Sequence, residues 1–188
     1  MNYIIEGCDR LGKDTFIETL KNKFGYFTII HHSKPVFCEF YKHRIEKNPL
    51  PYKNSELFLY QLESFNASMA LLKFAETSKQ KFILNRSWLG EAVYAPRYRG
   101  YSGDYIFDLE KNAGLDKIKN TKLILLVTSN WSHIQDDGQS FDFSAKEEEQ
   151  EDFIKAIQRS IFSKRQIIDI CRKDGTRKTP QELFEEIS

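Results

Sequence analysis

The stretch Tyr3-Ile4-Ile5-Glu6-Gly7-Cys8-Asp9-Arg10-Leu11-Gly12-Lys13 decides the fold, because a short apolar run passes directly into a glycine-rich loop that ends in lysine. Residues 7–13 fit the spacing G-x-x-x-x-G-K of a phosphate-binding loop. Glycines let successive backbone N–H groups point at phosphate oxygens, and the helix that follows adds its positive end. The stretch therefore predicts a nucleoside-triphosphate site made of Gly7, Cys8, Asp9, Arg10, Leu11, Gly12, Lys13, Asp14 and Thr15.

Position 14 departs from the common pattern, in which Ser or Thr follows the lysine and helps to hold Mg²⁺. Asp14 supplies a charged oxygen instead, and Thr15 offers a hydroxyl. Oxygen is the donor that Mg²⁺ prefers in proteins. We therefore expect ATP and Mg²⁺ as cofactors, with Asp14 and Thr15 as candidate metal ligands. A glycine-rich turn that only caps a helix is the competing interpretation, and the lysine in its strand–loop–helix setting argues against it.

Short apolar runs alternate with longer helical patterns, which predicts an α/β fold with a parallel sheet covered by helices. The runs are mostly continuous, as strands buried on both faces are. We expect strands at residues 3–5, 27–30, 82–84, 123–127 and 167–170. We expect helices at residues 13–24, 55–76 and 145–162, and after the start signal Thr179-Pro180-Gln181-Glu182.

Two polar segments follow the fourth run. Residues 131–144 contain Asp136-Asp137-Gly138 and are typical of a mobile loop. The acidic run Glu147-Glu148-Glu149 suits the N-terminus of the next helix, where negative charge is favourable. We expect this run to form a solvated face.

The length and composition of the chain limit the classes of protein to which it can belong. The 188 residues suffice for one substantial domain, so we expect a single domain over residues 1–188. A net charge of +1 gives no general attraction to nucleic acid or membranes, and neither is expected as a partner. The three cysteines show neither metal-ligand spacing nor a disulfide framework, and no leader or membrane-spanning run is visible. These features predict a cytoplasmic protein.

The string at residues 4–15 resembles thymidylate kinases and, more broadly, the nucleoside and nucleoside-monophosphate kinases of the P-loop class. Asn85-Arg86-Ser87 follows the third strand, where the family has Asp-Arg or Glu-Arg, so Asn85 is a departure. Residues 131–144 fall where the family has its lid. The resemblance implies a three-layer P-loop kinase fold with five parallel strands in the order 2-3-1-4-5, flanked by helices. The Gly-Lys-Asp form is similar to phage-type deoxynucleotide kinases, which would act in a host cytoplasm.

The resemblance also implies roles for charged residues. Asp9 would contact the 3′-hydroxyl of the acceptor sugar, Arg10 would act on the transferring phosphoryl group, and Arg86 would hold the acceptor's phosphate. Residues 131–144 contain no arginine, which agrees with thymidylate kinases that carry their catalytic arginine in the phosphate loop. Phosphoryl transfer mainly requires alignment and positive charge. The expected catalytic residues are therefore Lys13, Arg10 and Arg86.

A further group of residues is expected around the acceptor. Lys34 precedes Pro35, where nucleoside kinases carry a glutamate that serves as general base. A lysine is a poor base at neutral pH, but it can bind an acceptor that already carries a phosphate. Arg97 and Arg99 suit either a phosphate and stacked base or an ordinary solvated loop. The full set of acceptor candidates is Asp9, Lys34, Tyr60, Gln61, Phe65, Arg86, Tyr94, Arg97 and Arg99.

The helix predicted over residues 55–76 is expected to form one wall of the acceptor pocket. Gln61 can bond a base edge through its amide, and Tyr60 and Phe65 are stacking candidates. Phe65 also lies on the apolar stripe of this helix, so a place in the core is the competing interpretation. His31 and His32 lack partners at metal-ligand spacing, and we expect them to be structural.

These observations favour an ATP-dependent kinase that phosphorylates a deoxynucleoside monophosphate, dTMP or another dNMP, to the diphosphate. A deoxynucleoside kinase of the same fold is the first alternative, and a non-catalytic nucleotide-binding switch is the second. The only expected partners are small nucleotides and, since thymidylate-kinase relatives are commonly dimers, a second copy of the chain.

Overall fold

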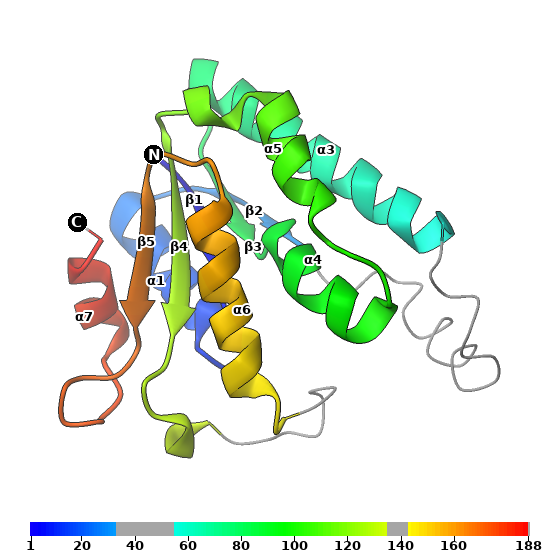
Figure 1. Cartoon of the computed structure of the whole chain (residues 1–188). Helices are drawn as coiled ribbons and strands as arrows, with labels where there is room; N and C mark the ends of the chain where they lie inside the picture. Colours follow the sequence, from blue (N-terminus) through cyan, green and yellow to red (C-terminus); the bar gives the residue numbers. More distant parts are fainter. Residues whose placement is uncertain (33–54, 135–142, 188) are drawn as a thin grey trace.

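Figure 1 shows the computed structural model of the chain, which describes residues 1–32, 55–134 and 143–187 and, over residues 55–60, the backbone alone. Within this part of the chain the sheet has five strands, all parallel, in the order β2-β3-β1-β4-β5. This order and direction confirm the fold that the sequence predicted. The strands are β1 (Asn2–Glu6), β2 (Thr28–His31), β3 (Phe82–Asn85), β4 (Thr121–Val127) and β5 (Arg165–Asp169).

Helices cover both faces of the sheet. Figure 1 shows α6 in front of β4 and α1 behind the sheet, where α1 packs against α7. On the other face α6 packs against α4, and α5 contacts both α3 and α4. The α-helices are α1 (Lys13–Phe24), α3 (Ser55–Thr77), α4 (Leu89–Tyr94), α5 (Tyr105–Ala113), α6 (Lys146–Arg159) and α7 (Pro180–Glu185), and shorter helical turns occupy Ala95–Arg99, Leu115–Lys117 and Trp131–His133.

The core forms around the central strands, because β1 is flanked on both sides and covered on both faces. All five residues of β1 are buried, and Ile4 pairs with Leu84 on β3 and Leu123 on β4. The apolar stripe of α3 also turns inward, with Phe65 and Met69 buried against this core. Phe65 therefore has the core position that its helical spacing indicated.

A local signal sets the start of α7 where the sequence expected it. Thr179 and Glu182 form a reciprocal capping box, in which each residue's side chain accepts a hydrogen bond from the other's backbone N–H, and Pro180 occupies the first turn of α7. The helix that contains the acidic run, α6, begins at Lys146 and ends at Arg159, three residues before the predicted end at residue 162. Among the described helices, none combines the length and apolarity needed to cross a membrane.

Candidate active site

The loop between β1 and α1 lies at the carboxyl edge of the sheet, where open parallel sheets bind ligands. Gly7 has a φ of +138°, and a Cβ there would lie 2.5 Å from the carbonyl oxygen of Leu126 on β4, so only glycine fits. Gly12, at φ +87°, caps α1, and Arg10 also has a left-handed backbone, at φ +72°. The loop thus has the curved backbone that a phosphate-binding loop requires.

Lys13 opens α1 and turns its ammonium back over the loop. Its Nζ donates to the carbonyl oxygens of Gly7 at 2.9 Å and Cys8 at 2.7 Å. Burial, together with the nearby Arg86 guanidinium, lowers the pKa of this ammonium to about 8, although the attraction of Asp9 acts in the opposite direction. Within the described residues this buried ammonium donates its hydrogen bonds to neutral carbonyls, and negative phosphate oxygens would stabilise its charge.

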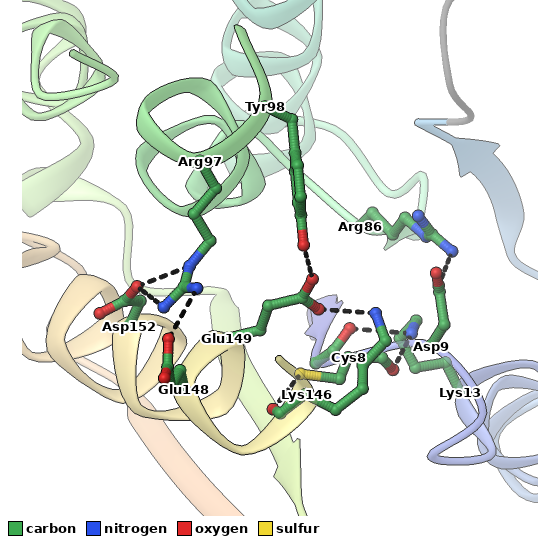
Figure 2. Close-up of polar contacts among 11 residues, drawn as sticks. Cys8, Asp9, Lys13, Arg86, Arg97, Tyr98, Lys146, Glu148, Glu149 and Asp152 are labelled. Atoms are coloured by element: carbon green, nitrogen blue, oxygen red, sulfur yellow. Dashed lines mark hydrogen bonds and ion pairs between the residues drawn. The ribbon is translucent and has the colours of Figure 1, made fainter. Parts of the chain in front are cut away.

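Arg86 and Asp9 meet across the front of this loop. Arg86 follows β3, where its backbone N–H donates to Ile5 on β1 at 2.9 Å and its φ is +68°. Its Nη2 forms an ion pair with Asp9 Oδ1, and Figure 2 shows the two side chains facing each other beside Lys13. The structure therefore joins two residues that the sequence placed 77 positions apart in one predicted site.

Glu6 and Ser87 hold Arg86 in place and were missed by the sequence interpretation. The Glu6 carboxylate is 1% exposed and accepts hydrogen bonds from the Ser87 backbone N–H and hydroxyl, each at 2.6 Å. Burial raises the pKa of Glu6, with these Ser87 hydrogen bonds acting in the opposite direction. This link fixes the turn after β3, and the Glu-Gly pair before the loop was the available signal.

Asp14, in the first turn of α1, contacts Asn85, the last residue of β3. Asn85 Nδ2 donates to Asp14 Oδ1 at 2.6 Å and lies 3.1 Å from His31 Nδ1. Asn85 Oδ1 is buried and has no hydrogen-bond partner among the described residues. Thr15 is exposed on the first turn of α1. No group of three His, Cys, Asp or Glu side chains suited to a metal occurs in the described ranges. A carboxylate bonded to an amide whose own oxygen is unsatisfied still fits Mg²⁺, which binds few protein ligands when phosphates supply the others.

The arginines of the turn after α4 point to carboxylates. Arg97 donates to Asp152 at 2.6 and 2.9 Å and to Glu148 at 3.2 Å, both on α6 (Figure 2). Arg99 forms an ion pair with the buried carboxylate of Glu91. Both guanidiniums therefore link the elements around the turn in this structure, and their predicted phosphate contacts remain predictions.

The expectation that the acidic run forms a solvated face is wrong for one of its three members. Glu149 is 1% exposed, whereas Glu147 and Glu148 are exposed. Glu149 accepts a 2.6 Å hydrogen bond from Lys146 Nζ and a 2.5 Å bond from the Tyr98 hydroxyl. The start of α6 packs against the loop, because Cys8 Sγ lies 3.8 Å from the carbonyl oxygen of Lys146. A helical turn places residues 146 and 149 on one face, which the run of like charges concealed.

The remaining acceptor candidates lie in the core, in a cluster of aromatic rings beside α6, or in undescribed segments. Gln61 is 8% exposed, and Phe65 is 3% exposed with its ring 6.0 Å from that of His32. The Tyr94 ring stacks on Tyr98 at 6.1 Å and meets Phe153 edge-on. Lys34, the Tyr60 side chain and residues 135–142 of the expected lid lie outside the described residues.

His32 is structural in the described part of the chain, as expected. It contacts the hydroxyls of Ser68 at 2.7 Å and Ser64 at 3.4 Å. Burial lowers its pKa to about 4, so the ring is neutral at neutral pH.

Comparison with known proteins found no matching family model and no matching curated sequence. The structure is similar to the thymidylate kinase of Ehrlichia chaffeensis (TM-score 0.60, 14% identity, 100% of this chain and 96% of that chain). It is also similar to that of Candida albicans (TM-score 0.58, 17% identity, 98% and 89%). The YorR protein of Bacillus subtilis, determined with phosphorylated GDP, matches at TM-score 0.56 and 14% identity over 100% and 95% of the two chains. The chain therefore has the P-loop kinase fold of the thymidylate kinases.

Proposed function

We propose that the protein is an ATP-dependent kinase that converts a deoxynucleoside monophosphate, dTMP or another dNMP, to its diphosphate. The observation that carries this proposal is the convergence of Lys13 and Arg86 on either side of Asp9. Lys13 opens α1 and Arg86 follows β3, and the two positive charges repel each other, which Asp9 offsets only in part. A donor triphosphate and an acceptor phosphate would supply anions for both.

The position of each charged residue suggests its role in phosphoryl transfer. Lys13 would exchange its bonds to the loop carbonyls for bonds to the outer phosphates of ATP. Arg86 would release Asp9 and bind the acceptor's phosphate, and Asp9 would then accept a hydrogen bond from the sugar hydroxyl. Arg10, exposed in the loop, would approach the transferring phosphoryl group. Mg²⁺, when bound with ATP by Asp14, supplies further positive charge at the phosphates.

A deoxynucleoside kinase would need a general base for a neutral hydroxyl. Among the described carboxylates near the loop, Glu6 accepts hydrogen bonds from Ser87, Asp14 accepts one from Asn85, and Asp9 is the residue proposed to bind the sugar hydroxyl once Arg86 releases it. A monophosphate acceptor avoids this need because its attacking oxygen is already ionised. This arrangement favours the monophosphate over the nucleoside as acceptor.

An ADP-release assay with ATP, Mg²⁺ and a panel of nucleosides and monophosphates tests the proposal. We expect turnover with at least one deoxynucleoside monophosphate. Turnover with nucleosides alone would refute the choice of acceptor, and tight ATP binding without turnover for any acceptor would favour a non-catalytic switch.

Lys13→Ala tests the loop itself. We expect turnover to fall by at least about 100-fold, the scale for removing one donor that stabilises a transition state, while the thermal transition remains. Lys21→Ala, on the exposed side of α1 and paired only on the surface with Glu18, is the matched control and should keep wild-type turnover. Near wild-type activity of Lys13→Ala would show that the loop is not the phosphate site.

A further inference from the structure

Two sequence departures from the usual phosphate-loop pattern touch each other in the folded protein. Asp14 occupies the position after the loop lysine, and Asn85 is the last residue of β3. They are 71 positions apart in sequence, yet Asn85 Nδ2 donates to Asp14 Oδ1 at 2.6 Å. Two local departures are therefore a single feature of the site.

P-loop enzymes commonly hold Mg²⁺ with a neutral hydroxyl after the lysine and a carboxylate from a neighbouring strand. Here the ligand types are exchanged: the carboxylate stands on α1, and the strand position carries a neutral amide. The pair keeps one negative charge. Carboxylates at both positions would repel each other at this distance, so Asn85 is the residue type that accommodates Asp14.

The second observation is the state of the Asn85 amide. The residue is 6% exposed, and its Oδ1 is buried without a hydrogen-bond partner among the described residues. An unpaired buried acceptor is costly, and a cation or a water bound to it would satisfy it. Rotation about the Cβ–Cγ bond exchanges the two ends of an amide, so Asn85 can present either group beside Asp14.

We propose that Asp14 and Asn85 together form the divalent-cation site, with the charged ligand on α1 and the neutral ligand on β3. This inference rests on the proposed use of ATP with a divalent cation and deepens it by naming which side chains bind the cation. Thr15, the other candidate, is exposed on the first turn of α1, as Asp14 is, but it is not part of this hydrogen-bonded pair.

Mn²⁺ is a suitable probe because its free concentration can be followed by electron paramagnetic resonance without any acceptor or turnover. The titration uses the full chain with a non-hydrolysable ATP analogue. Asp14→Asn should weaken Mn²⁺ binding at least about 10-fold, the lower end for disturbing a metal site. The exchanged protein, Asp14→Asn with Asn85→Asp, should recover most of that loss, because it moves the carboxylate across the same hydrogen bond.

Two further variants complete the test. Glu18→Gln removes a solvent-facing carboxylate one turn along α1 and should leave Mn²⁺ affinity unchanged. If the exchanged protein fails to fold, Asp14→Ser with Asn85→Asp restores the common pattern and should regain affinity relative to Asp14→Ser alone.

The proposal would be overturned by unchanged Mn²⁺ affinity in Asp14→Asn, or by an exchanged protein that binds no better than Asp14→Asn. A loss of affinity in Thr15→Val that matches the loss expected of Asp14→Asn would likewise transfer the site to the hydroxyl. The Mn²⁺ titration stays informative even if no acceptor is phosphorylated, so failure of the proposed function is distinguishable from failure of this inference.

Discussion

Glu149→Gln tests the buried charge cluster that anchors α6 beside the phosphate loop. The Lys146 and Glu149 side chains are 5% and 1% exposed, and their charged atoms lie 2.6 Å apart. Tyr98 donates a second hydrogen bond to the same carboxylate (Figure 2). The substitution keeps the shape of the side chain and removes its charge, so Lys146 is left as a buried ammonium without its counter-ion.

The expected cost follows from that burial. Removing one partner of a buried ion pair destabilises a protein by about 3–5 kcal/mol, because the remaining charge is uncompensated. Glutamine has one acceptor oxygen in place of two and can keep one of these two hydrogen bonds, so we expect the lower end, about 3 kcal/mol. For a chain of this length, 1 kcal/mol shifts the melting temperature by about 2–4 °C, which predicts a decrease of about 6–12 °C.

Urea denaturation and calorimetry measure this cost, with Glu148→Gln as the control. Glu148 is the neighbouring residue, its side chain is 74% exposed, and its ion pair with Arg97 is 3.2 Å long. Such a surface pair contributes about 1 kcal/mol or less. Equal losses in the two variants would refute the argument that burial makes Glu149 different. Adding Lys146→Met to Glu149→Gln should restore part of the stability, since no unpaired charge then remains.

Two predictions concern pH. Because burial lowers the pKa of Lys13 to about 8, ATP binding near that pH should take up protons, and calorimetry in buffers of different ionisation enthalpy should show it; identical binding enthalpies would contradict this. His32 has a pKa of about 4 in the folded chain against about 6.5 unfolded, so stability should fall by up to about 3 kcal/mol as pH drops between those values. Denaturation of His32→Asn should show a shallower pH slope, and an unchanged slope would contradict the assignment.

Much of the fold was predictable because its signals are local. The glycine spacing of residues 7–13, the continuous apolar runs of the buried strands and the capping box at Thr179 each depend on neighbours within a few positions. Each of these signals corresponds to an element in the structure, with boundaries shifted by no more than three residues.

The sequence by itself determined the phosphate loop and the parallel α/β fold, because loop curvature and strand burial depend on short local patterns of residues. It also indicated that Lys13 and Arg86 lie at the carboxyl edge of the sheet. Only the tertiary structure decided which charges meet. Glu6 holds Ser87, Asn85 holds Asp14 and Arg97 binds Asp152, across 81, 71 and 55 positions. Such pairs depend on strand order and helix packing, which bring distant residues together at one edge of the sheet. For the same reason Glu149 looked like one of three solvated charges and proved to be buried.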